Sequence, residues 1–139
     1  MGPHEDILRD IVDQFGVLQS VVIARDVLAR PEEYELTFEG GVLLVGVNAD
    51  DDTIRLGRGR SELPDRIDVS AWGPWQRAVG ASAIWAWQLQ NQQGYSDALQ
   101  VEFALVEGFT TVQLVCQASA IQTLAVEEAK SLTMPWDHG

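Results

Sequence analysis

The chain of 139 residues has few of the side chains on which most enzymes and metal proteins rely. It has two histidines, His4 and His138, which lie near opposite ends of the chain, and a single cysteine, Cys116. Because histidine is the commonest general base near neutral pH, this scarcity argues against Ser-His-Asp and Cys-His catalysis. A lone cysteine forms neither an internal disulfide nor a zinc site. We therefore expect no metal and no other cofactor.

Positive charge is also scarce, because 21 acidic residues face nine basic ones and give a formal net charge of −12. Such a field repels phosphate backbones, so nucleic acid is not an expected partner, whereas a basic protein is. Four arginines gather in one short segment, but three acids lie among or beside them: Arg55, Arg58, Arg60, Glu62, Asp65, Arg66 and Asp68. We interpret this segment as a solvated, self-compensating loop rather than as an anion site.

Long hydrophobic runs are absent, since the longest, 21–24 and 42–47, are far too short to cross a bilayer. The first residues, MGPHEDILRD, carry acids where a secretory signal has a basic region. The apolar neighbours of Cys116 at alternating positions predict that it faces a core, which suits a reducing compartment. These features predict a soluble, cytoplasmic protein with no membrane association.

Hydrophobic residues make up 46% of the chain, which is enough for one core and predicts a single domain over residues 1–139. Apolar residues at helical spacing predict a helix over 5–15, with Pro3 before it and Gly16 after it. Alternation from Val17 to Leu28 predicts a strand. Residues 59–83 form an irregular connection with one short helix near Pro74, and residues 128–139 form a tail.

Two successive meanders account for most of the remaining chain. In the first, over 34–58, a Gly40-Gly41 loop sets Tyr34, Leu36 and Phe38 opposite Val47, Val45 and Leu43. An Asp50-Asp51 turn then places Ile54 and Leu56 opposite Val47 and Val45. We interpret the acids of NADDDT, residues 48–53, as turn residues rather than a calcium loop, because Thr53 and Gly59 stand where such a loop needs Gly and an acid.

In the second meander, over 84–127, a Gln92-Gln93-Gly94 loop sets Trp85 opposite Val101 and Trp87 opposite Leu99, so both tryptophans should face the core. Two further turns are expected, at Glu107-Gly108 and around 119–121. They pair the following residues: Phe103 with Val112, Val101 with Leu114, Leu99 with Cys116, and Leu124 and Val126 with Cys116 and Leu114. The predicted fold class is α+β, mainly β: an N-terminal helix plus about eight antiparallel strands, in one curved sheet or a small sandwich.

Two groups of residues are candidate binding sites. Trp72 and Trp75 either cap the open end of the core or form a patch that binds a partner. Asn91, Tyr95 and Asp97 have the inward parity at one end of the second meander. They form either a structural hydrogen-bond network or a small recess for a ligand or for a basic side chain of a partner.

The pattern Trp85-x-Trp87, Asn91-x-x-Gly94-Tyr95-x-Asp97, followed by alternating Leu99, Val101 and Phe103, resembles a family of small bacterial proteins classed only as a domain of unknown function. The segment VNADDDTIRL and the Val79-Gly80 step resemble it too, and the likeness covers roughly residues 17–127. It implies a fold and draws attention to Asn91, Tyr95 and Asp97, but it implies no activity.

The leading functional hypothesis is a non-catalytic protein-binding module, not an enzyme, whose partner is preferentially basic. Its acidity and small α+β domain also resemble the immunity proteins of bacterial toxin systems in general style. The alternative is a small-ligand-binding protein or an enzyme based on carboxylates, with its site near Asn91, Tyr95 and Asp97.

Overall fold

The computed structural model describes residues 3–25, 33–48, 53–90, 96–117 and 120–125. Within these ranges the chain forms two helices and nine strands. In chain order they are α1 (Pro3–Asp13), β1 (Leu18–Arg25), β2 (Glu33–Phe38), β3 (Gly41–Asn48), β4 (Thr53–Arg58), β5 (Asp65–Asp68), α2 (Gly73–Ala78), β6 (Ser82–Gln90), β7 (Ser96–Leu105), β8 (Gly108–Gln117) and β9 (Ala120–Ala125). The predicted fold class, α+β and mainly β, is confirmed.

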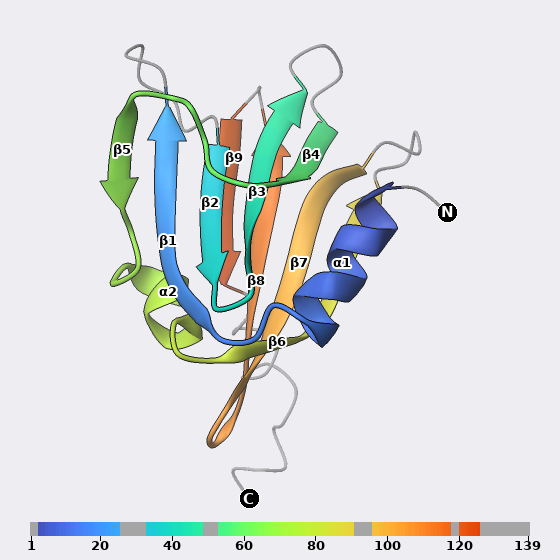
Figure 1. The fold of residues 1–139 in the computed structure, drawn as a ribbon, viewed down its shortest axis with the longest axis vertical. Coiled ribbons are helices and arrows are strands. Elements are labelled where there is room, and N and C mark those ends of the chain that lie inside the picture. Colours follow the sequence, from blue (N-terminus) through green and yellow to red (C-terminus); the bar gives the residue numbers. More distant parts are fainter. Residues whose placement is uncertain (1–2, 26–32, 49–52, 91–95, 118–119, 126–139) are drawn as a thin grey trace, which may run out of the picture.

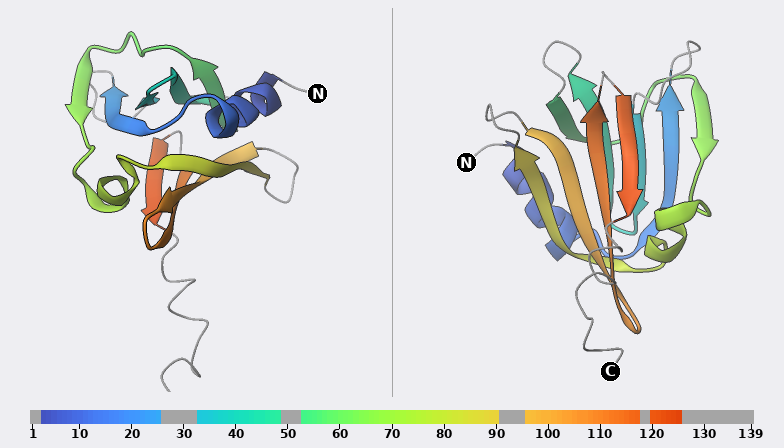
Figure 2. Two further views of the ribbon diagram at one scale, coloured as in Figure 1. Left: turned by 60° about the horizontal axis from the view of Figure 1, so that its bottom comes forward. Right: turned by 180° about the vertical axis from the view of Figure 1, so that it is seen from behind.

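The strands form two antiparallel sheets that lie face to face (Figure 1, Figure 2). The first sheet has the order β4-β3-β2-β1-β5 and the second has the order β6-β7-β8-β9. β4 contacts β7 and β8, and β3 contacts β9. Since the buried residues of both sheets belong to one cluster, the inner faces share a single core. Of the two arrangements that the sequence left open, the chain adopts the small sandwich.

The two helices cover the sides of this sandwich. α1 begins and ends two residues earlier than predicted, and it buries Ile7 and Ile11 beside the edge strands β4 and β6. α2 has Pro74 in its first turn, as predicted, and buries Trp75 and Ala78 next to the second sheet. The connection 59–83 is more regular than predicted, because it also contains β5 and the start of β6.

The turn between β2 and β3 is Glu39-Gly40, not the predicted Gly40-Gly41, so Phe38 lies opposite Gly41. This shift of two residues leaves the apolar side chains on the predicted face, because side chains alternate with a period of two. Gly41 is needed for packing rather than for the turn: a Cβ atom there would lie 2.8 Å from Cζ of Phe15. The β3–β4 pairing follows the prediction, with Val45 opposite Leu56.

In the second sheet, the β7–β8 turn is Val106-Glu107 rather than Glu107-Gly108, which again shifts the register by two and preserves the buried face. Cys116 is buried, as predicted, but it lies opposite Ile121. The predicted register between β8 and β9 is therefore wrong, and Leu124 lies opposite Gln113 instead of Cys116. Val126 lies outside the described residues.

Candidate functional site

The most consequential departure from the predicted register is a β-bulge near the start of β6. Ala83 lies opposite Phe103, but Trp85 lies opposite Glu102 instead of Val101, and Ile84 is the extra residue between these pairs. One extra residue turns the odd-numbered side chains that follow it to the other face of the sheet. The prediction that Trp85 and Trp87 face the core is therefore wrong.

Both tryptophans lie on the outer face of the second sheet. Trp85 is 59% exposed and Trp87 is 38% exposed, although large aromatic side chains are usually buried. Their rings stack, with centroids 6.1 Å apart and ring planes 21° apart. The pair forms a wide aromatic surface on an edge strand.

Polar side chains extend this aromatic surface across the sheet. Gln100 lies opposite Trp87 and next to Gln113 of β8, whose Nε2 donates a hydrogen bond of 2.6 Å to Oε1 of Gln100. Glu102 lies opposite Trp85, and Thr111 of β8 continues that row. We call these two rows the tryptophan face: Trp85, Trp87, Gln100, Glu102, Thr111 and Gln113.

A hollow of about 320 Å³ adjoins the tryptophan face between α1 and β6. Leu8 and Val12 of α1 give it an apolar wall, and Arg9 and Asp13 add one charge of each sign. Trp85 therefore has Glu102 opposite it across the sheet, and it lines the hollow together with Arg9 and Asp13. The exposed aromatic pair, with the Glu102 carboxylate in the same row, suits a cationic side chain.

The other predicted pair of tryptophans lies elsewhere, at α2. Trp75 is buried in the core and Trp72 is 59% exposed. A role of these residues in binding a partner stays a prediction. Both line a cavity of about 290 Å³, together with Gly73 and Pro74 between them and four residues from the strands and the preceding turn. We call it the aromatic pocket, with these principal lining residues: Ile23, Tyr34, Val69, Trp72, Trp75 and Thr123.

Tyr34 contributes the buried hydroxyl of this pocket, and its oxygen accepts a hydrogen bond of 2.8 Å from Oγ1 of Thr123. Burial raises the pKa of the Tyr34 phenol above its ordinary value of about 10, and the hydrogen bond from Thr123 opposes this increase in part. The phenol is therefore neutral in the folded protein at physiological pH.

This raised pKa predicts a loss of stability in alkali. The contribution is fully present below the unfolded pKa of about 10 and is lost as the pH rises through the higher folded pKa. Tyr34→Phe should lower the free energy of unfolding by about 1 kcal/mol near pH 7 and flatten its decline between about pH 9 and about pH 11. Urea unfolding at each pH measures both effects. Tyr95→Phe controls for the only other tyrosine, and an unchanged decline in Tyr34→Phe would contradict the prediction.

Of the predicted trio Asn91, Tyr95 and Asp97, only Asp97 lies within the described residues. It is half-buried and forms a second bulge, because Ala98 lies opposite Leu89 while Ser96 lies opposite Gln90. A shared recess of these three groups stays a prediction.

Sequence reasoning missed Glu35, a carboxylate that is fully buried on the outer side of β2. Its Oε2 atom lies 2.6 Å from Nη2 of Arg66 and accepts a hydrogen bond of 3.1 Å from the Ser61 amide. Its Oε1 atom lies 3.2 Å from Nη1 of Arg60. The arginine segment therefore folds over the first sheet and pairs with a strand residue, instead of compensating its own charge as predicted. We call these four residues the Glu35 cluster.

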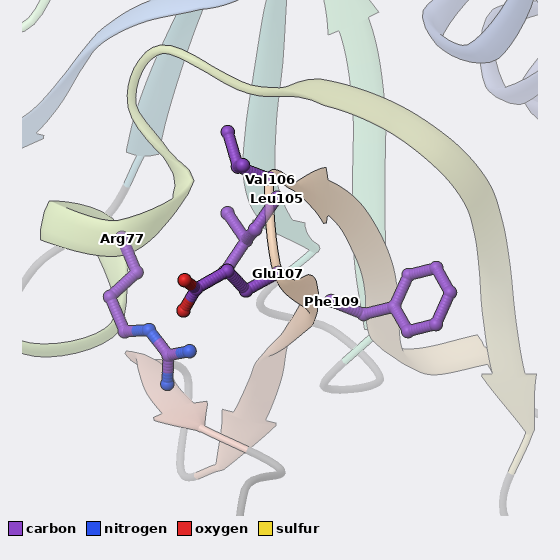
Figure 3. Close-up of a pocket in the computed structure, with 5 residues that line it drawn as sticks. All are labelled: Arg77, Leu105, Val106, Glu107 and Phe109. Carbon is purple, nitrogen blue, oxygen red and sulfur yellow. The ribbon is translucent and has the colours of Figure 1, made fainter.

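A third cavity, of about 340 Å³, lies between α2 and the β7–β8 turn (Figure 3). The guanidinium of Arg77 and the carboxylate of Glu107 point toward one another there, whereas Phe109 points away from them (Figure 3). Val106, beside them, is fully exposed. Since the two charges are opposite, the recess has no net preference for an anion or a cation.

In the part of the chain that the structure describes, no three His, Cys, Asp or Glu side chains come together in a group that could hold a metal ion. Among the same residues, no helix has the length and apolarity needed to cross a membrane.

In a comparison with known protein families, one family model matches residues 8–130, which is most of the chain. The chain belongs to DUF6334, a family of unknown function. The expected resemblance to an uncharacterised family is thereby confirmed. No curated protein and no solved structure shows a significant match to the chain. Family membership therefore assigns no role to the tryptophan face or to the aromatic pocket, and their chemistry has to be argued from the residues.

Proposed function

We propose that this DUF6334 chain is a non-catalytic protein-binding module that docks a basic partner protein on the tryptophan face. The observation that carries the proposal is the bulge at Ile84, which is accompanied by the outward orientation of Trp85 and Trp87. Bulges often lie where a strand re-aims side chains for a function. Tryptophan is also the residue type most enriched among the anchors of protein interfaces.

The charge of the partner follows from the surroundings of these rings. Lysine and arginine side chains bind the faces of tryptophan rings through cation–π attraction, and Glu102 supplies a carboxylate to pair with them. A net charge of −12 also speeds encounter with a basic protein and slows encounter with a polyanion. The cytoplasmic location and the likeness to immunity proteins stay predictions, as does the alternative of a ligand or enzyme site at Asn91, Tyr95 and Asp97.

Affinity capture from the native host tests the proposal with three baits: the wild-type chain, Trp85→Ala/Trp87→Ala and Trp72→Ala. We expect a partner on the wild-type bait in about 0.05 M salt and much less of it in about 0.5 M salt, where surface charge is screened. The double variant should raise the dissociation constant of the purified complex about 30-fold. This corresponds to a loss of about 2 kcal/mol of binding free energy, as expected for an aromatic anchor.

Trp72→Ala is the matched control, because Trp72 has the same exposed fraction as Trp85 but lies next to α2. It should bind the partner with wild-type affinity. Circular dichroism must show that all three baits are folded. A complete lack of partners at either salt concentration, or full binding by the double variant, would refute the proposed function.

A further inference from the structure

β6 is an edge strand, and the right-hand view of Figure 2 shows it at the margin of the second sheet. The edge of β6 that faces away from β7 is bridged to Val17 at Ser82, and beyond that bridge no described strand pairs with it. Alternate residues of an edge strand direct their N–H and C=O groups away from the sheet. β6 therefore offers a row of backbone hydrogen-bonding groups to an added strand.

The composition of β6 does not protect this edge. Natural edge strands are usually guarded by charged side chains, by short length or by a covering element. β4 carries two arginines and β5 has the charged sequence DRID, whereas β9 has six residues and contacts α2. β6 has nine residues, SAIWAWQLQ, with neither a charge nor a proline. It is therefore the edge at which pairing with another strand is least opposed.

A regular stretch of β6, from Trp85 to Leu89, lies between the two bulges and pairs with β7 without interruption. Trp85 and Trp87 point to the outer face, whereas Ala86, opposite the core residue Val101, points to the inner face. Residues side by side on adjacent strands share a face. An added strand would therefore set alternate side chains against the two rings and the side chain between them against Ala86.

The hollow of about 320 Å³ between α1 and β6 lies beside this stretch and is lined in part by Ala86. Leu8 and Val12 form its apolar wall and are only half-buried, so an incoming side chain reaches them. Arg9 and Asp13 are exposed there and carry opposite charges, which gives the hollow no preference for either sign. The hollow therefore suits an apolar side chain.

We propose that an extended segment of the basic partner adds to β6 as a further strand, with one apolar residue between two basic residues. This inference rests on the proposed function and specifies how the partner is held. The basic side chains lie over the rings of Trp85 and Trp87, with Glu102 on the next strand beyond Trp85. The apolar side chain enters the hollow. Backbone hydrogen bonds to β6 supply affinity, and the alternating side-chain contacts supply specificity.

A second copy of the chain is disfavoured as the occupant of this edge. Each copy has a net charge of −12, so two copies repel each other, and β6 has no basic side chain to place over the rings of another copy. Sedimentation of the chain alone should therefore show a monomer at the concentrations used for binding. A dimer that Trp85→Ala/Trp87→Ala dissociates would show that a second copy pairs with β6 and would overturn the proposal.

Short peptides with blocked ends test the predicted pattern on the full chain by calorimetry. An extended Ser-Thr-Arg-Val-Arg-Thr-Ser peptide has both arginines on one face and the valine on the other. The permuted peptide Ser-Arg-Arg-Val-Thr-Thr-Ser has the same composition but only one arginine on each face. The first peptide should bind about tenfold more tightly than the second. Equal affinities would overturn the proposal, as would a lack of binding by the first peptide.

N-methylation separates strand addition from docking by side chains alone, because it removes one backbone donor and leaves the side chains in place. Two isomers of the first peptide carry the methyl group on the nitrogen of the valine or of the arginine after it, and these two N–H groups point to opposite sides of a strand. One isomer should lose about tenfold in affinity or more, and the other should bind like the unmodified peptide. Equal affinities of the isomers would overturn strand addition.

Substitutions in the chain locate the peptide. Trp85→Ala should weaken its binding about tenfold, and Trp72→Ala, equally exposed in the wild-type chain, should leave it unchanged. Peptide binding that Trp85→Ala leaves intact would overturn the assignment to β6. The two proposals fail separately, because full binding of the captured partner by Trp85→Ala/Trp87→Ala refutes the proposed function, whereas isomers of equal affinity refute only strand addition.

Discussion

Replacing Arg60 and Arg66 together by methionine should lower the free energy of unfolding by about 3 to 5 kcal/mol at neutral pH. Glu35 is fully buried, and the double variant leaves its carboxylate with the Ser61 amide but without a positive charge. A buried charge that has lost its partners is much more costly than a surface ion pair that has been removed. The loss would be a large part of the total stability of a domain of this size.

Urea unfolding followed by tryptophan emission measures this loss of stability. Two further variants identify its cause. Arg55→Met removes a half-exposed arginine that pairs with Glu33 at 2.9 Å, and should cost less than about 1 kcal/mol. Adding Glu35→Met to the double variant should restore most of the stability, because the uncompensated charge is then absent. A triple variant no more stable than the double variant would show that Glu35 is not the source of the loss.

The buried faces of the hairpins could be predicted because most errors in the predicted strand register are shifts by an even number of residues. A turn misplaced by one residue, as at Gly40 and Glu107, shifts the pairing by two and leaves the same side chains buried. The apolar faces of β2, β3, β7 and β8 were therefore correct even where individual partners were not. Local residue patterns determine which face of a strand is buried, whereas the exact partners depend on turn geometry.

The orientation of Trp85 and Trp87 could not be predicted, because the bulge has no sequence signature of its own. In the segment SAIWAWQLQ, apolar residues occupy both parities, and Ile84 is neither a glycine nor a turn residue. Regular alternation then places the large aromatic residues inside, which is the usual outcome in a core. The inner face instead accepts Ala86, which lies opposite Val101.

Glu35 was missed for a different reason. Its position between the inward residues Tyr34 and Leu36 predicts an outward side chain, which is correct, and an outward glutamate is ordinarily solvated. Its burial depends on the connection after β4 crossing this face of the sheet, which is a tertiary contact that no local pattern reports. The four nearby arginines were the available signal, since a cluster of guanidinium groups needs carboxylate partners. In the structure Arg60 and Arg66 pair with Glu35, and Arg58 pairs with Asp10, so these partners lie outside the arginine segment.

Glu102→Lys should weaken binding of the proposed basic partner about 100-fold or more. Glu102 lies opposite Trp85 on the outer face, so the substituted lysine would stand where the partner's cationic side chain docks. Like charges in contact across an interface cost several kcal/mol, which exceeds the loss expected from removing a favourable contact alone. Calorimetry with the partner captured by the wild-type chain measures the effect, and Glu102→Gln should give an intermediate loss.

Glu62→Lys separates this local effect from the overall field, because it replaces one negative with one positive charge just as Glu102→Lys does. Glu62 is exposed in the connection between β4 and β5, on the first sheet's side of the molecule. Both variants reduce long-range steering equally, so Glu62→Lys should slow association only a few-fold and leave dissociation unchanged. If both variants weaken the complex equally, the acidity of the chain acts only at a distance, and the tryptophan face is not the docking surface.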